Sequence, residues 1–220
     1  MKAKMIAYTA LDEEVLAELA YNMHTEPVTW ADELAEFAGR SCYLSWNRPN
    51  PKTATNQGYL GHILEVGHFS VLEHASATFY IEDVPRSFTH ELVRHRHMSF
   101  SQVSQRYVDE SEADLVLPPN GDHEEEVLLR EHHAAALRLY KRLVDNRLAN
   151  GQSRKQAREA GRAVLPNATE TKIVVTGNLR SWRELLGKRT GEGVDALFRD
   201  VATELLRQLK GLAPNTFQDM

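Results

Sequence analysis

The sequence predicts an α+β fold that is rich in helix and carries a small, mostly antiparallel sheet. Long segments with apolar residues at helical spacing outnumber a few short segments in which polar and apolar residues alternate. The chain has 220 residues, 42% of them hydrophobic and 26% charged, which are ordinary values for one globular domain. We therefore expect a single domain over residues 1–220, in which the pairing order of the strands is left open.

The first third of the chain predicts one strand followed by helices. The strand is expected at residues 3–9, and the helices at 11–23, 29–43 and 59–69, with a turn-rich segment before the last of them. Thr29 suits the N-cap of the second helix because its side-chain oxygen can accept a hydrogen bond from a free backbone N–H. The third helix should end near Gly67, since glycine adopts the left-handed conformation that terminates many helices.

The rest of the chain predicts two more strands among longer helices. Strict alternation indicates a half-buried strand at residues 75–83, and residues 171–177 predict another. Pro85 can open a helix over 85–97. The longest helix is expected at 124–150, about 40 Å at ~1.5 Å per residue. Further helices are expected before Pro166, at 179–188 and at 194–212.

The overall charge excludes some classes of protein. The net charge is −5 and the pI is about 6.1, so a basic surface for coating nucleic acid is not expected. The first residues lack the apolar core of a signal peptide, and no run approaches the ~18 apolar residues of a membrane span. Cys42 is the only cysteine, which rules out an internal disulfide and a thiolate zinc cluster. These features favour a reducing cytoplasm.

One stretch is unusual for an acidic chain: "RHRHMSFSQVSQR", residues 94–106, holds three arginines and no acid. A solvated helix face is one interpretation. Two observations count against it: Phe88, Leu92 and Val93 predict that the preceding helix is partly buried, and the acids that normally neutralise an exposed face are missing. Arginine recognises phosphate through a planar, two-pronged contact. The residues alone therefore predict a site for one or two phosphate-bearing ligands.

The same stretch fits the pattern R-H-R-x-x-S-x-x-x-x-S-x-R, filled by Arg94, His95, Arg96, Ser99, Ser104 and Arg106. This pattern resembles the signature of the flavin-dependent thymidylate synthases, the ThyX family. The segments "GHFSVLEHASATFYI", "NATETKIVVTGNLRSWRELLGKR" and "EFAGRSCYLSWNRPNPKTATN" are also similar to segments of that family. The resemblance covers the chain from about residue 33 to its C-terminus.

The resemblance implies a fold, a reaction and an assembly. The fold would be the α+β fold of ThyX proteins, assembled as a homotetramer whose active sites are shared between subunits. The enzyme would be a methyltransferase of dTMP biosynthesis, a flavoprotein that binds FAD. It would methylate dUMP with 5,10-methylenetetrahydrofolate as carbon donor and NADPH as reductant of the flavin, giving dTMP and tetrahydrofolate.

The resemblance also implies roles for individual residues. The flavin would be bound by His68, Ser70, Glu73, Arg94, His95, Arg96, Gln102, Asn178, Leu179, Arg180 and Glu184. The nucleotide would be bound by Glu91, Leu92, Val93, Arg94, Gln102, Val103, Ser104, Gln105, Arg106, Arg162 and Arg189. Arg189 would be the catalytic residue, because a fixed guanidinium favours the anion that forms when N3 of the uracil loses its proton.

Two positions depart from the family pattern. Glu184 stands where relatives tend to have an imidazole or an amide near the flavin, and its carboxylate is expected to repel a pyrophosphate. Gly193 stands where several relatives have a histidine shortly after the catalytic arginine. Neither position lies in the signature, so we expect altered cofactor affinity and the same reaction.

Other patterns point to weaker alternatives. His62, His68 and His74 recur every six residues, which does not align them on one helix face for a metal. "GKRTGEG" lacks the residues of a phosphate-binding loop, and no G-x-G-x-x-G follows a strand. Cys42 could be a nucleophile, but a buried, inert thiol is the simpler interpretation. Ser99 and Ser104 are read as hydrogen-bonding groups for a ligand. The rival to an enzyme is a module in which the arginines bind a nucleic-acid backbone.

Overall fold

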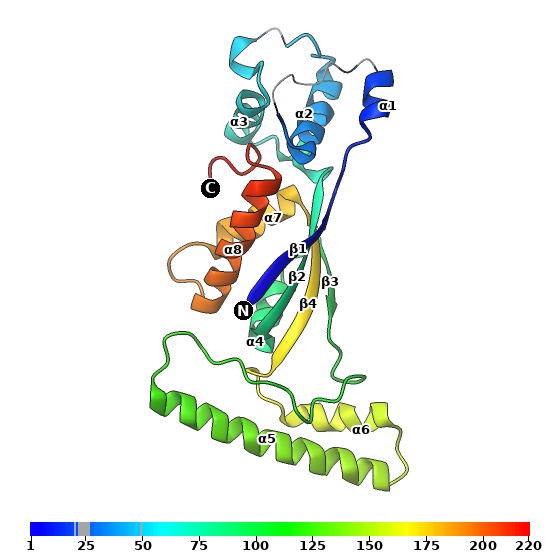
Figure 1. Cartoon of the computed structure of the whole chain (residues 1–220), viewed down its shortest axis with the longest axis vertical. Coiled ribbons are helices and arrows are strands. Elements are labelled where there is room, and N and C mark those ends of the chain that lie inside the picture. The colour runs from blue at the N-terminus through cyan, green and yellow to red at the C-terminus, as the bar shows by residue number, and fades with distance from the viewer. Residues whose placement is uncertain (20, 22–26, 49) are drawn as a thin grey trace. The chain divides into compact units, whose positions relative to one another are not determined.

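The computed structural model describes residues 1–19, 21, 27–48 and 50–220 (Figure 1). Within these residues the strands are β1 (Lys2–Tyr8), β2 (Ser76–Pro85), β3 (Met98–Gln102) and β4 (Glu170–Asn178). They form one sheet in the order β1-β2-β4-β3.

Neighbouring strands of the sheet run antiparallel. Between β2 and β4, the hydroxyl oxygens of Thr78 and Thr176 lie 2.9 Å apart, and the Asp83 amide donates to the Glu170 carboxylate at 3.4 Å. Residue numbers therefore rise along one strand as they fall along its neighbour. The small antiparallel sheet expected from the sequence is confirmed, and its order is set by pairings between distant segments.

Helices make up most of the remaining described structure. They are α1 (Glu13–Glu18), α2 (Trp30–Tyr43), α3 (Asn56–Val66), α4 (Arg86–Leu92), α5 (His123–Ala149), α6 (Arg154–Gly161), α7 (Leu179–Arg189) and α8 (Ala196–Leu212). Two local predictions are confirmed. The Thr29 side chain accepts from the Asp32 amide at the start of α2, and Gly67 ends α3 with a φ of 73°.

The structure corrects the prediction of one helix over residues 85–97. Helix α4 ends at Leu92, and residues 98–102 form β3, in which intermediate and exposed residues alternate. Met98, Ser99, Phe100 and Ser101 already alternate apolar and polar residues in the sequence, although this alternation is short and adjoins the charged cluster. Phe88 and Leu92 are buried, which confirms that this helix is partly buried, whereas Val93, just after it, is 44% exposed. The predicted helix over 11–23 is described only as α1, and its later residues lie outside the described part of the chain.

The chain divides into two compact units. The first unit holds Met1–Lys2, Tyr80–Arg94 and Phe100–Val174, and the second holds Ala3–Phe79, His95–Ser99 and Val175–Met220. Every strand contributes residues to both units. The units are described separately below.

In the second unit, α7 packs onto β2 through Trp182. The indole is fully buried, its Nε1 donates to the Ala77 carbonyl at 3.1 Å, and its ring meets Phe79 edge-on with centroids 5.0 Å apart. A Cβ on Gly177 would lie 2.7 Å from the terminal methyl of Met98, so the flexible methionine side chain would have to shift to accommodate it. Replacing a buried tryptophan by alanine costs about 3–5 kcal/mol, which makes Trp182 a central core residue.

Buried charges also organise the second unit. The Asp32 carboxylate is fully buried and accepts hydrogen bonds from the Thr216 amide, the Thr216 hydroxyl and the Asn215 amide at 2.9, 2.6 and 2.9 Å. Glu36 and Arg40, also buried, form an ion pair at 2.5 Å within α2. The contacts of Asp32 attach the segment that follows α8 to α2.

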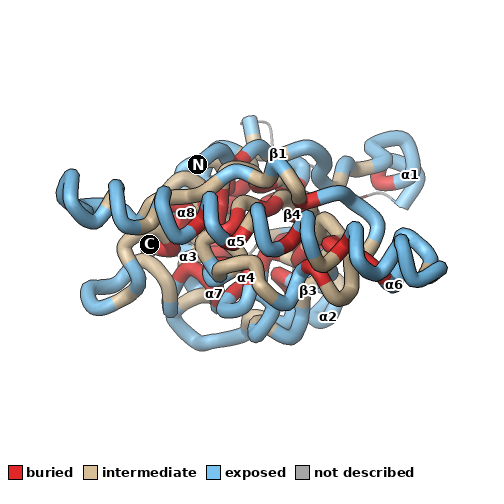
Figure 2. Tube along the Cα trace, turned by 90° about the horizontal axis from the view of Figure 1, so that it is seen from below, coloured by how far each residue is buried: buried red, intermediate tan, exposed pale blue. Residues whose placement is uncertain are grey.

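In the first unit, α5 lies side by side with α6 (Figure 1). Their contact is a small apolar cluster of Tyr140, Val144 and Ala157, with Val164 and Leu165 packed against it. The opposite side of α5 is exposed along most of its length (Figure 2). Among the described residues, no helix combines the length and the apolar character that a membrane span requires.

Candidate active site

The second unit contains a polar cavity lined by residues that the resemblance assigns to the flavin. Its volume is about 310 Å³, and it is lined by Glu73, His97, Asn178, Arg180, Ser181 and Glu184. Arg180 donates to Glu73 at 2.6 Å across this cavity. The Asn178 side chain caps α7 by accepting from the Ser181 amide at 2.8 Å, which leaves its NH₂ group to donate to a ligand.

A second cavity of the same unit, of about 360 Å³, shares Arg180 with the first. His68 and Ser70 line it, together with the aromatic rings of Tyr43, Tyr59 and Phe69. One cavity is thus polar and charged, the other is partly aromatic, and a guanidinium belongs to both. This arrangement suits an elongated ligand with an anionic centre and flat rings.

Arg189 is the last residue of α7, and its contacts include a hydrogen bond and a cation–π contact. Its Nε donates to His95 Nε2 at 3.3 Å, and its guanidinium carbon lies 4.6 Å from the centroid of the Phe198 ring. Since arginine has no acceptor, His95 Nε2 must accept, which places the ring proton on Nδ1. Burial lowers the pKa of His95, and the charges of Arg189 and Lys188 lower it further. The imidazole is therefore kept neutral.

Glu184 differs from the expectation of simple repulsion. Its carboxylate accepts from the Lys188 ammonium group at 2.6 Å, one turn further along α7. The hydrogen bond from Lys188 lowers the pKa of Glu184, and the same lysine adds an attractive charge. The negative charge is thus offset locally. Gly193 has a φ of 85°, a left-handed conformation in which a histidine side chain would be strained.

Cys42 is exposed, so the expectation of a buried thiol was wrong. It lies in the last turn of α2, beyond the buried face that ends at Arg40, and it lines the cavity that contains His68 and Ser70. The contact found for its sulfur is a 3.4 Å hydrogen bond to the Ala38 carbonyl. A carbonyl cannot remove the thiol proton, so this contact does not activate the sulfur.

In the first unit, the segment 102–106 is held in place from several directions. Gln102 Nε2 donates to the Thr89 and Thr171 hydroxyls at 2.9 and 3.2 Å. Arg86 donates to the Val103 carbonyl at 2.7 Å. The Arg106 guanidinium pairs with Glu159 of α6. These contacts give the predicted nucleotide-binding segment a defined conformation before any ligand binds.

Two arginines of this region have donors with no partner. Arg86 Nε and Arg106 Nε are buried and make no hydrogen bond within the described part of the chain. Burial lowers the pKa of Arg86, Glu110 raises it, and the charge of Arg162 lowers it. A buried N–H donor costs free energy until an acceptor arrives, so the region favours an anionic ligand.

The predicted residues separate between the two units. Most of the flavin set lies in the second unit and most of the nucleotide set in the first; the exceptions are Arg94 and Gln102 in the first unit and Arg189 in the second. Leu92 and Leu179 are fully buried, so neither residue presents a surface to a ligand in this structure. Arg94, Arg96 and Arg162 are exposed.

Sequence reasoning missed Arg86 and His97. Arg86 is the first residue of α4, where a cation opposes the helix dipole, and this was the available signal. His97 occupies an unspecified position of the signature and lines the polar cavity. No group of three metal-ligating side chains occurs among the residues described.

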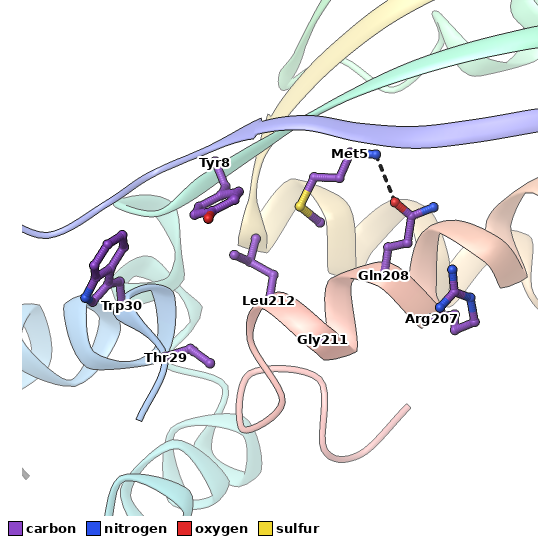
Figure 3. Close-up of a pocket in the computed structure, with 8 residues that line it drawn as sticks. All are labelled: Met5, Tyr8, Thr29, Trp30, Arg207, Gln208, Gly211 and Leu212. Atoms are coloured by element: carbon purple, nitrogen blue, oxygen red, sulfur yellow. Dashed lines mark hydrogen bonds between the residues drawn. The ribbon is translucent and has the colours of Figure 1, made fainter. Parts of the chain in front are cut away.

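The largest of these cavities lies away from the predicted residues (Figure 3). It measures about 500 Å³ and is lined by Met5, Tyr8, Thr29, Trp30, Arg207, Gln208, Gly211 and Leu212. Gln208 is engaged by the Met5 amide and the Ala3 carbonyl, both at 2.8 Å, and Arg207 pairs with Glu204. Gln208 and Arg207 thus already have partners, and this cavity contains none of the residues predicted to bind a ligand.

Comparison with known proteins shows the family to which the chain belongs. Residues 25–215 match the family described as thymidylate synthase complementing protein. The chain is 54% identical over 228 residues to a probable flavin-dependent thymidylate synthase of Mycobacterium phage D29, covering 100% of this chain and 96% of the relative. It is 49% identical over 237 residues to its counterpart of phage L5, covering 100% and 97%. The flavin-dependent thymidylate synthase of Mycobacterium tuberculosis strain H37Rv is 54% identical over 195 residues, covering 84% and 78%. The chain belongs to the flavin-dependent thymidylate synthases.

Proposed function

We propose that this chain, as a flavin-dependent thymidylate synthase, converts dUMP into dTMP with a division of labour between its two units. The second unit holds the flavin and the catalytic arginine, and the first unit holds the nucleotide phosphate. The carbon donor is 5,10-methylenetetrahydrofolate, NADPH is the reductant, and tetrahydrofolate is the second product. The observation that carries the proposal is the hydrogen bond from Arg189 to His95. It connects the C-terminal end of α7 to the signature segment, although the two residues are 94 positions apart in the sequence.

Arg189 activates the pyrimidine by electrostatics. C5 of uracil becomes a better nucleophile when N3 loses its proton, and a guanidinium fixed beside the ring stabilises that anion. The guanidinium stays charged because arginine is not deprotonated near neutral pH. Neutral His95 and the Phe198 ring both contact the guanidinium and help to fix its orientation. The site therefore stabilises charge that develops during the reaction.

The residues of the second unit fit FAD. Arg180 provides charge for a diphosphate, the Asn178 amide and the Ser70 hydroxyl provide hydrogen bonds, and the aromatic side of the second cavity provides flat surfaces. We assign the remaining contacts to His68, Glu73, His95, Arg96, Leu179 and Glu184, with Arg94 and Gln102 from the first unit. When bound and reduced, FAD supplies the hydride that the reaction needs.

The residues of the first unit fit the phosphate of dUMP. Arg106 pairs with Glu159, and Arg86 donates to the Val103 carbonyl. The Nε of each arginine is buried and has no hydrogen-bond partner in the described part of the chain. We assign the nucleotide to Glu91, Leu92, Val93, Arg94, Gln102, Val103, Ser104, Gln105, Arg106 and Arg162, with Arg189 from the second unit. Arg106→Ala should mainly raise KM for dUMP, because a phosphate contact acts equally in the ground state and the transition state.

The assembly forms part of the same proposal. We propose a homotetramer with active sites shared between subunits, in which residues 1–220 act as one catalytic domain located in the cytoplasm. The exposure of Arg94, Arg96 and Arg162 supports shared sites, since each side chain is accessible to a ligand held by another subunit. Cys42 has no role in this mechanism.

An absorption spectrum of the purified protein tests the proposal. The protein should be yellow or become yellow with FAD, and the flavin spectrum should shift when dUMP is added. A protein that folds but never takes up FAD, and instead binds nucleic acid with a steep salt dependence, would contradict it. Cys42→Ala should retain dTMP formation; complete loss in a flavin-bearing variant would favour a thiol mechanism.

A further inference from the structure

The exposed side of α5 carries a regular stripe of six residues. They are spaced by three and four positions and are all exposed: Glu125, Leu128, His132, Ala135, Leu139 and Arg142. This spacing places them along one side of the helix, as in a coiled-coil seam. Leu128 and Leu139 are 59% and 42% exposed, and the buried side of α5 uses other residues, Tyr140 and Val144 among them. The stripe is thus a second, unoccupied contact surface of this helix.

Two copies of this stripe are complementary to each other when their helices lie antiparallel. The spacing between successive members is three, four, three, four and three residues, which reads the same in both directions. When two such helices lie antiparallel, Leu128 of one copy meets Leu139 of the other and Glu125 meets Arg142. His132 then meets Ala135, whose small side chain leaves room for the imidazole. A two-fold axis repeats each of these pairs.

The charges of the whole helix support the antiparallel orientation. The half from 123 to 136 has four glutamates and one arginine, whereas the half from 137 to 149 has four basic residues and one aspartate. Parallel copies would bring like halves together, and antiparallel copies bring opposite halves together.

The charges that flank the stripe also remain available. Within the described part of the chain, no ion pair closer than 4.0 Å involves Glu125, Glu131, Arg138 or Arg142, although Glu126 and Arg130 pair at 2.8 Å on the same helix. In the register that joins Leu128 to Leu139, Glu131 of one copy lies beside Arg138 of the other. Each end of the contact would then have one Glu131–Arg138 ion pair and one Leu128–Leu139 apolar contact.

We propose that two copies of this chain pair through α5, antiparallel about a two-fold axis. The inference rests on the proposed homotetramer and names one of its interfaces. Stable interfaces bury about 1,200–2,000 Å² in total, more than two leucines per copy supply, so the stripe aligns a larger contact surface. Its residues favour this register, because a slide of three residues in one direction would place Leu128 opposite Arg142.

Charge reversal at the flanking pair tests this interface. Glu131→Arg alone places two arginines together at both ends of the contact, and Arg138→Glu alone places two glutamates together. Each variant should associate at least roughly tenfold more weakly than the wild type in sedimentation velocity. An equimolar mixture should recover wild-type association, because every arginine then faces a glutamate. Lys141→Glu is the matched control: it makes the same charge change as Arg138→Glu on the same helix, away from the stripe, and should have no effect.

The outcomes separate this interface from the proposed function. Circular dichroism confirms that each variant is folded, and FAD uptake by the wild type is measured in parallel. A mixture that fails to recover association, or a control as weak as Arg138→Glu, overturns the interface and assigns the stripe to another occupant. A wild type that binds FAD and responds to dUMP as a monomer overturns the interface alone. A wild type that takes up no FAD overturns the proposed function, whatever its state of association.

Discussion

At the scale of single residues, the hydrogen bond from Arg189 to His95 is the contact that bears most directly on the proposed catalysis. A guanidinium held between an imidazole and an aromatic ring has little freedom to rotate, so its charge is already oriented before the substrate binds. Both residues belong to the second unit, and neither is fully exposed. Two predictions follow from this geometry.

Arg189→Ala should bind FAD normally and lose turnover by roughly 10²–10³-fold or more, the cost of removing one preorganised electrostatic group. Single-turnover kinetics of dTMP formation, with a flavin titration alongside, measure the two effects separately. Arg189→Lys keeps the positive charge but not the planar contact, and serves as the control. Full activity in the flavin-bearing alanine variant would remove Arg189 from the mechanism.

Turnover should also fall on the acidic side as His95 becomes protonated. Burial and the neighbouring positive charges hold the pKa of His95 below its usual value of 6.5, so the neutral ring persists at pH 7. Protonation adds a donor at Nε2, which then faces the donor of Arg189, and the contact is lost as pH drops through the lowered pKa. A pH profile of kcat for the wild type and His95→Gln measures this. An unchanged acidic limb in His95→Gln would assign that limb to another group.

At the scale of elements, α7 places an acidic residue of the polar cavity, Glu184, beside a basic residue that pairs with it. Glu184 and Lys188 are one turn apart, and their side chains form an ion pair at 2.6 Å although each is more than half exposed. Because the lysine lies beside the carboxylate, we expect the departure from the family pattern at position 184 to have a small effect on FAD affinity. The helix thus carries both the departure and its compensation.

This compensation can be measured with a double-mutant cycle. Lys188→Met should weaken FAD binding by roughly tenfold, since it leaves the Glu184 carboxylate uncompensated near an anionic ligand. Glu184→Gln alone should change FAD affinity by less, and the double variant should recover most of the loss. Flavin titration measures all four affinities. Independent, additive effects would show that the ion pair plays no part in cofactor binding.

At the scale of the whole molecule, the second unit depends on a contact between its early and late segments. The buried Asp32 carboxylate accepts hydrogen bonds from Asn215 and Thr216, 183 and 184 residues away. Asp32→Ala should lower the free energy of unfolding by about 3 kcal/mol, because two backbone amides and a hydroxyl lose their acceptor. Urea denaturation measures this loss. Asn215→Ala is the control: it keeps the backbone amide and removes only the 2.8 Å side-chain hydrogen bond to Asn56, so it should cost about 1 kcal/mol.

Local features of the fold could be predicted from the sequence with good precision. Thr29 as an N-cap, Gly67 as a helix end and the alternation along β2 each depend on a few neighbouring residues, and each is confirmed. The strand β3 was missed, and α4 was extended too far, because a short polar strand beside a charged cluster has no strong signal of its own. Cys42 was misplaced because the exposure of one residue in the last turn of a helix depends on what packs there.

By itself the sequence determined the class of fold, the arginine-rich signature and its resemblance to a family, since these depend on residue type and spacing along the chain. Tertiary structure alone decided that Arg189 meets His95, that Arg86 supports the segment 102–106 and that α5 exposes a self-complementary stripe. The physical reason is the same in each case. A contact between distant residues forms only when packing brings both side chains together, and such a contact cannot be predicted from the spacing of residues in a single sequence.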